Sequence, residues 1–93
     1  MKHHIIVKYT SAVTDKEAML ERIKNLFSNA SPICGVHSYS FYTNCVDRKN
    51  RYDLMIVIEL DSDCLLYWDE SPLHKAWLSC FGQYIAQKAI FDC

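Results

Sequence analysis

Hydrophobic and polar residues alternate near the start of the chain in the pattern of a β-strand. The run covers residues 3–9 and is rich in β-branched side chains, which favour extended backbone. Successive side chains of a strand point to opposite faces, so His3, Ile5 and Val7 share one face. We expect this face to pack against the rest of the protein, and His3 to point inward with it.

Apolar residues then recur at the spacing of an α-helix. Between Met19 and Phe27 they return every three or four positions, which predicts an amphipathic helix over residues 15–29. Thr14 and Glu17 stand three positions apart at its start, the spacing of a capping box. We therefore expect the Thr14 hydroxyl to accept one of the helix's first backbone N–H groups.

Two further strands follow the helix. Residues 36–43 alternate and are rich in aromatic and β-branched side chains, and residues 52–60 give the strongest strand pattern of the chain. The polar residues 44–50 between them are typical of a hairpin connection. In the third strand we expect the alternate apolar residues from Leu54 to Leu60 to face the helices.

The second helical region is predicted to be broken in two. The polar residues 61–63 favour an N-cap for a short helix over residues 65–68. Ser71-Pro72 then supplies an N-cap serine and a proline at the first helical position, and helical spacing continues up to Gly82. Residues 84–92 complete the pattern as a last strand.

This order of elements predicts the fold class. A strand, a helix, two strands, a helix and a strand form the β-α-β-β-α-β arrangement of ferredoxin-like folds, an α+β class with a four-stranded antiparallel sheet and both helices on one face. We expect a single domain over residues 1–93. Its other sheet face would be apolar, so we predict a homodimer in which two sheets pack face to face and close into a barrel. The open face would include His4, Ile6, Met55, Val57, Ala89 and Phe91.

Composition narrows the class of protein. With 93 residues and 51% hydrophobic side chains, the chain has enough apolar material for one core. Its net charge of −1 gives no electrostatic sign of a nucleic-acid partner. Its apolar runs are far shorter than the roughly 20 residues of a membrane-spanning helix. We therefore expect a cytoplasmic protein that binds neither nucleic acid nor membrane.

The five cysteines are scattered and odd in number, without a Cys-x-x-Cys pair. We interpret them as reduced thiols, with Cys34, Cys64 and Cys80 acting as small apolar fillers. No two candidate ligands have the spacing of a structural zinc site, so no metal and no other cofactor is predicted.

Candidate chemistry concentrates on two histidines. His74 lies in the first turn of the last helix, where an imidazole can act as a general base or a hydrogen-bond donor. A histidine held by a backbone carbonyl is the common structural alternative. His3 should point toward the helices, where it can meet His74, unless it is simply part of a fraying terminus.

Two adjacent aromatic residues precede His74. Tyr67 can supply a phenol to a cavity, but neighbouring helical residues diverge by about 100°, so at most one of Tyr67 and Trp68 faces inward. Trp68 and Trp77 are more typical of a core than of a ligand cage.

Several motifs together are specific enough to indicate a family. They are His3 followed by Lys8, Gly35-Val36, Tyr52-Asp-Leu, Ser71-Pro-Leu-His74 with Trp77 and Phe81 after it, Tyr84, and Phe91-Asp92. In this order the chain resembles the stress-responsive A/B barrel family, also called the Dabb or dimeric α/β-barrel domain. The resemblance spans nearly the whole chain and implies the ferredoxin-like fold and a homodimeric barrel.

The resemblance also implies a chemistry. The domain is similar to cofactor-free polyketide cyclases, in which a helix-start histidine and an aromatic hydroxyl act on a β-polyketone. Carried over by position, the catalytic histidine falls on His74 and the first-strand histidine on His3, while the tyrosine position falls on Trp68 and a frequent histidine on Ser71. An indole N–H donates a hydrogen bond but does not exchange a proton at useful pH, so Tyr67 would have to turn inward to replace the phenol.

Two classes of function therefore remain. In the enzyme hypothesis, His74, with His3 and Tyr67, acts on a small, apolar, carbonyl-bearing substrate. In the binding or structural hypothesis, which we favour, the same space is filled core or a passive ligand pocket, and the dimer is the functional unit. Under either, the predicted pocket residues are Ile23, Phe27, Ile56, Ile58, Trp68 and Trp77.

Overall fold

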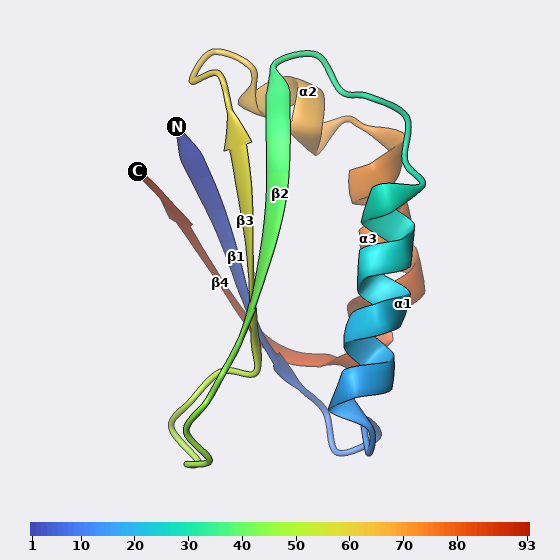
Figure 1. Cartoon of the computed structure of the whole chain (residues 1–93), viewed down its shortest axis with the longest axis vertical. Helices are drawn as coiled ribbons and strands as arrows, with labels where there is room; N and C mark the ends of the chain where they lie inside the picture. Colours follow the sequence, from blue (N-terminus) through green and yellow to red (C-terminus); the bar gives the residue numbers. More distant parts are fainter.

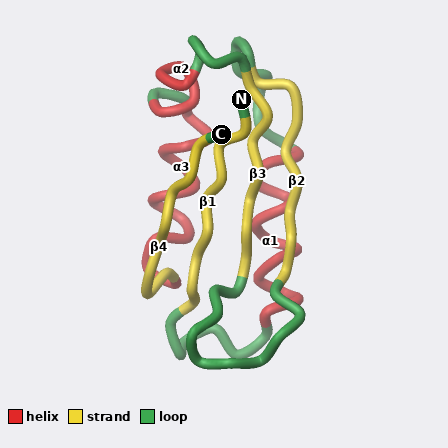
Figure 2. The backbone as a smooth tube through the Cα atoms, turned by 90° about the vertical axis from the view of Figure 1, so that its left-hand side faces the viewer, coloured by secondary structure: helices red, strands yellow, loops and turns green.

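A computed structural model describes all 93 residues and contains one four-stranded sheet. The strands are β1 (Lys2–Tyr9), β2 (Val36–Thr43), β3 (Leu54–Leu60) and β4 (Ile85–Asp92), and every pairing is antiparallel. Their order across the sheet is β2-β3-β1-β4, so the first and last strands of the chain lie side by side (Figure 2). The predicted α+β arrangement and sheet are confirmed.

The helices form a second layer on one face of the sheet (Figure 1). They are α1 (Lys16–Ser28), α2 (Leu65–Asp69) and α3 (Pro72–Phe81), followed by a single 3₁₀ turn, η1 (Gly82–Tyr84). The break between α2 and α3 falls at the predicted Ser71-Pro72. None of the helices has the length and apolar character that crossing a membrane requires.

The core lies between the two layers. On β1 the inward residues Ile5 and Val7 are at most 2% exposed, and His3 is buried beside them, as their shared face predicted. The inward positions of β3 are equally closed, which confirms that the residues from Leu54 to Leu60 alternate toward the helices. The helices contribute Met19, Ile23, Phe27, Trp68, Leu73, Trp77 and Phe81.

Two of the three predicted helix caps were assigned to the wrong residue. Asp15, not Thr14, caps α1, because its carboxylate accepts the Ala18 N–H at 3.0 Å. The N-cap position of α2 is Cys64, which makes no side-chain capping hydrogen bond. Ser71 caps α3 as predicted. Neighbouring residues with similar capping propensity compete for one position, and backbone geometry decides between them.

The cysteines were also only partly predicted. All five are free, but only Cys64 is buried, whereas Cys34 and Cys80 are exposed and therefore fill no core space. Cys64 explains the glycine next to Cys34: Gly35 has φ +82°, and a side chain there would collide with Cys64 Cβ and Sγ. Only glycine accepts this left-handed backbone at no steric cost.

The sheet face away from the helices carries a mostly apolar surface. Register aligns two rows of side chains across all four strands: Tyr42, Met55, Ile6 and Ala89 in one, and Ser40, Val57, His4 and Phe91 in the other. Tyr42 is 54% exposed and Phe91 62% exposed. No element of this chain covers the face (Figure 2).

Candidate functional site

His3, which is buried, pairs with an exposed residue from the far end of the chain. Because β1 and β4 run antiparallel, His3 lies directly opposite Asp92, and its Nδ1 is 2.5 Å from Asp92 Oδ1. The His3 side chain is 7% exposed and that of Asp92 is 40% exposed. A carboxylate only accepts, so the imidazole donates its Nδ1–H and keeps Nε2 for another contact.

His74 is oriented by the break between α2 and α3. Its backbone N–H donates to the N-cap oxygen Ser71 Oγ at 3.1 Å. Its ring Nδ1–H donates to the backbone carbonyl of Asp69 at 2.8 Å. This carbonyl contact is the structural alternative anticipated for His74, and it leaves Nε2 as the nitrogen able to accept a proton or a ligand.

Trp68 packs against both histidines. Its indole is 1% exposed, and its ring centroid is 6.3 Å from that of His3 and 5.0 Å from that of His74. The other side of the indole stacks on Phe27 at 6.1 Å. Ser71, at the start of α3, holds the Trp68 backbone, because its hydroxyl donates to the Trp68 carbonyl at 2.7 Å. Both imidazoles therefore lie against the same indole.

A small cavity of about 280 Å³ adjoins this cluster. Its walls include both histidines, Trp68, Trp77, Lys88 and Asp92. The volume lies at the lower end for ligand sites, and the wall mixes two indoles with charged groups. Such a site suits a molecule of a few heavy atoms with a polar end. The structure does bring His3 and His74 to one cavity, as the sequence suggested.

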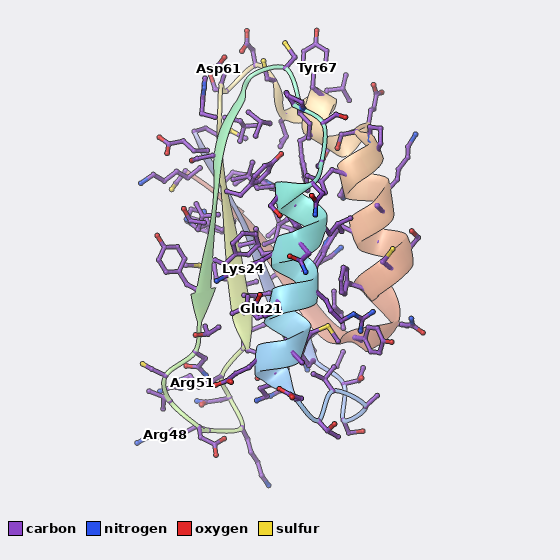
Figure 3. All side chains as sticks on the ribbon, turned by 45° about the vertical axis from the view of Figure 1, so that its right-hand side comes forward. Glu21, Lys24, Arg48, Arg51, Asp61 and Tyr67 are labelled. Atoms are coloured by element: carbon purple, nitrogen blue, oxygen red, sulfur yellow. The ribbon has the colours of Figure 1, made fainter.

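The other predicted site residues lie elsewhere. Ile23, Phe27, Ile56 and Ile58 are at most 3% exposed and belong to the packed core, and they line none of the three larger cavities. Tyr67 is 55% exposed at the end of the molecule (Figure 3), so its phenol points away from the histidines. Of the two adjacent aromatics, Trp68 is the one that turns inward.

Sequence reasoning missed Asp92 as the partner of His3. The signal was present: a ferredoxin-like order places the last strand beside the first, and Asp92 alternates onto the same face as His3. The structure gathers no group of three or more His, Cys, Asp or Glu side chains able to hold a metal ion.

Comparison with known proteins gives structural likeness only. No family model matches the chain, and no curated protein matches it either. A dimeric ferredoxin-like protein of unknown function from Thermobifida fusca has a TM-score of 0.78 at 21% identity, over 97% of this chain and 85% of that chain. A Dabb family protein with a ferredoxin-like fold from Mesorhizobium loti has a TM-score of 0.73 at 16% identity, over 99% of this chain and 92% of that chain.

An enzyme shares the same architecture. The hydroxynitrile lyase from Passiflora edulis has a TM-score of 0.73 at 12% identity, over 97% of this chain and 87% of that chain. Identities this low establish the fold and leave activity open. The chain therefore has the ferredoxin-like fold, which it shares with these proteins.

Proposed function

We propose that this chain is a stress-responsive A/B barrel domain whose functional unit is a homodimer, with the open sheet face of one copy packed on that of the other. The observation that carries the proposal is the pair of cross-strand rows on that face, in which Phe91 is 62% exposed and Tyr42 is 54% exposed. Ile6, Met55 and Val57 extend the same surface across the central strands.

A second copy is the occupant that fits this surface. A contiguous apolar patch over all four strands is costly to leave in water. A two-fold contact lets one patch cover its own copy, and sheets pack well face to face. Two of the structurally similar proteins are described as dimeric, which supports the same assembly here.

Five free cysteines support a reducing compartment, so we place the dimer in the cytoplasm.

A charged residue within the patch tests this assembly. Phe91→Asp should convert the dimer to a monomer, because two carboxylates would have to be buried in one apolar interface. Leu66→Asp is the matched control, since Leu66 is 63% exposed but lies on α2 in the helical layer. Light scattering after size exclusion measures the mass of each. A monomeric wild type, or a dimeric Phe91→Asp variant, would contradict the proposal.

The second candidate function is acid–base chemistry on a small carbonyl compound in the cavity beside Trp68. Two oriented imidazoles favour it: Asp92 fixes His3 and the Asp69 carbonyl fixes His74. In this scheme His74 Nε2 removes a proton from the carbon next to the carbonyl. The His3 ring, which Asp92 orients, hydrogen-bonds the carbonyl oxygen and stabilises the negative charge that develops there.

Proton exchange tests this chemistry without knowledge of the natural substrate. Acetylacetone in D₂O exchanges its central protons, and NMR follows the rate. A general base should raise the rate by about 10²–10⁴-fold over the contribution of a free imidazole, and His74→Gln should remove that gain. His37→Gln is the control. The His37 ring, like that of His3, pairs with a carboxylate, Asp61 at 2.8 Å, but its side chain is 59% exposed and lies outside the cavity. Equal rates for wild type and His74→Gln would exclude the catalytic role.

A further inference from the structure

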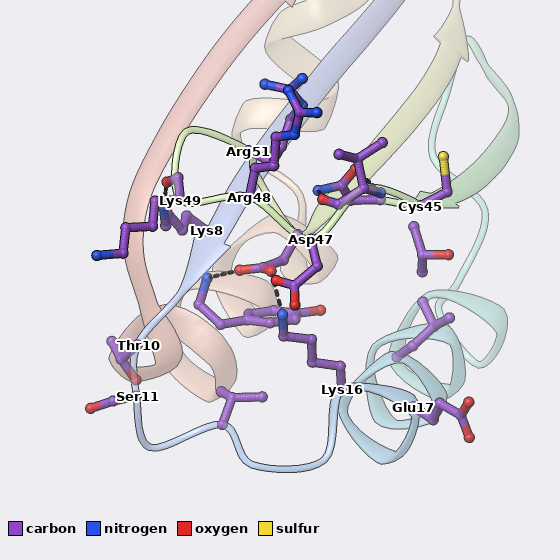
Figure 4. A pocket seen from close by; sticks show the side chains of 17 residues that line it. Lys8, Thr10, Ser11, Lys16, Glu17, Cys45, Asp47, Arg48, Lys49 and Arg51 are labelled. Carbon is purple, nitrogen blue, oxygen red and sulfur yellow. Dashed lines mark hydrogen bonds and ion pairs between the residues drawn. The ribbon is translucent and has the colours of Figure 1, made fainter.

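The largest cavity of the protein lies at the opposite end of the sheet from the histidines. It has a volume of about 970 Å³ and is lined by the loop between β2 and β3, the segment between β1 and α1, and the first turn of α1. Figure 4 shows the β2–β3 loop with Arg48, Lys49 and Arg51 across the cavity from Thr10 and Ser11. This volume is sufficient for a small organic molecule.

The charge of this cavity differs from that of the chain. Five of the ten Lys and Arg residues line it, but only three of the eleven Asp and Glu residues do. The protein as a whole has a net charge of −1, whereas the cavity has two more cations than carboxylates. Concentrating cations in a concave site raises the local concentration of anions there.

The Asp53 carboxylate in the cavity already has hydrogen-bond partners within the protein. Asp53 accepts the Tyr9 backbone N–H and the Lys16 ammonium, each at 2.8 Å. Burial alone would raise the pKa of Asp53, but the hydrogen bond from Lys16 and that from Tyr9 hold it below its ordinary value. Lys8 donates to the Lys49 carbonyl. Asp53 therefore neutralises Lys16 and is not available to the cations of the loop.

The loop cations have no such partner. Arg48, Lys49 and Arg51 make no ion pair with any carboxylate within 4.0 Å, and Arg51 donates only to the neutral Asn50 side chain, at 2.6 Å. A guanidinium offers five N–H donors in a planar fork that matches the oxygens of a phosphate or carboxylate. These side chains retain most of their donors for an anion.

Neutral donors complete the wall. Thr10 Oγ1 is the one buried side-chain oxygen or nitrogen of the protein without a hydrogen-bond partner. A buried hydroxyl without a partner is unfavourable for the stability of the fold. The Tyr9 phenol also lines the cavity, and burial together with the charge of Asp53 raises its pKa to about 12, so it stays protonated as a donor.

We propose that this cavity binds the phosphate monoester of a small organic molecule, with Arg48, Lys49 and Arg51 holding the phosphate. Two excess positive charges match the charge of about −1.5 to −2 that such a group has at neutral pH. The volume exceeds what a bare phosphate fills, and Val13, Leu20 and Val46 give the wall an apolar part for the organic moiety.

Titration of ¹⁵N-labelled protein, followed by NMR, tests the proposal with matched probes. Glucose 6-phosphate and adenosine monophosphate are compared with glucose and adenosine, which lack the phosphate, and with inorganic phosphate, which lacks the organic part. We expect saturable shifts confined to residues 8–17 and 43–53 for at least one ester, and weaker binding of inorganic phosphate. Absence of saturation at about 10 mM ester, or equal binding of the ester and its dephosphorylated counterpart, would overturn the proposal.

Charge-matched variants separate the site from overall electrostatics. Arg48→Gln with Arg51→Gln should weaken binding of the ester by at least about tenfold, because two charge-assisted contacts are lost. Lys24→Gln with Lys75→Gln removes the same charge from exposed positions outside the cavity and should change affinity less than about twofold. Equal losses in the two double variants would show that net charge, not this site, attracts the ester.

Discussion

Replacing Trp68 by alanine tests whether this indole is a buried part of the core beside the two histidines. Trp68 is 1% exposed, whereas its neighbour Tyr67 is 55% exposed. An aromatic side chain buries about 150–250 Å², and at about 25 cal/mol per Å² its complete burial contributes about 4–6 kcal/mol. Aromatic-to-alanine substitutions in cores cost about 3–5 kcal/mol, so we expect a loss of about 4 kcal/mol for Trp68→Ala.

Tyr67→Ala is the matched control, because the two residues are adjacent aromatics on the same short helix. About half of the Tyr67 side chain is already in water, so we expect its loss to cost about 1 kcal/mol. Urea denaturation followed by circular dichroism gives both values. If the free energy of unfolding falls by about 1.3 kcal/mol per molar urea, the midpoint should fall by about 3 M for Trp68→Ala and by less than about 1 M for Tyr67→Ala.

The protein concentration must be fixed in this assay, because a dimer is stabilised by mass action. Trp68→Phe provides a milder version that retains the fold, with an expected loss of about 1–2 kcal/mol. A Trp68→Ala variant no less stable than Tyr67→Ala would refute the assignment of Trp68 to the buried core beside His3 and His74.

Three further variants probe other parts of the structure through urea denaturation. Gly35→Ala should lower the free energy of unfolding by at least about 2 kcal/mol, because alanine is strained at φ +82° and its Cβ meets Cys64. Asp53→Asn should lower the free energy of unfolding by about 1–2 kcal/mol at pH 7. The pKa of Asp53 is lowered on folding, so its stabilisation is present above the unfolded value of 3.8 and is lost as pH falls through the folded value; Asp53→Asn should therefore flatten the acid side of the stability profile. Thr10→Val should gain up to about 1 kcal/mol, because it removes a buried hydroxyl without a partner.

Most of the fold was predictable because its signals are local. The inward residues of β3 alternate with near-complete burial, and Ser71-Pro72 marks the start of α3 through capping chemistry alone. The cap of α1 was assigned to Thr14 rather than Asp15, because two adjacent residues with similar propensity differ only in backbone geometry. Such choices depend on dihedral angles that sequence patterns do not specify.

The candidate site was predictable in part. His3 and His74 do reach one cavity, since strand alternation and a helix start fix their directions. The pairing of His3 with Asp92 joins residues 89 positions apart and requires the register of β1 against β4. Which of Tyr67 and Trp68 turns inward depends on the phase of a five-residue helix, too short for periodicity to determine.

The cavity at the other end of the sheet shows a further limit of prediction from the sequence. The polar residues between β2 and β3 were interpreted only as a hairpin connection, although Arg48, Lys49 and Arg51 lie close together there. Their role depends on the segment around Thr10, which tertiary structure brings opposite the loop. A cluster of cations in a loop therefore indicates a site only when the surface that faces it is known.

The central claim is that the open sheet face is the interface of a homodimer, and sedimentation equilibrium of the unmodified protein tests it most directly. The chain has a mass of 10.9 kDa. Our account predicts a particle of twice that mass across the micromolar range, with dissociation on Phe91→Asp and not on Leu66→Asp. A wild-type mass of one chain at the highest concentrations would contradict it.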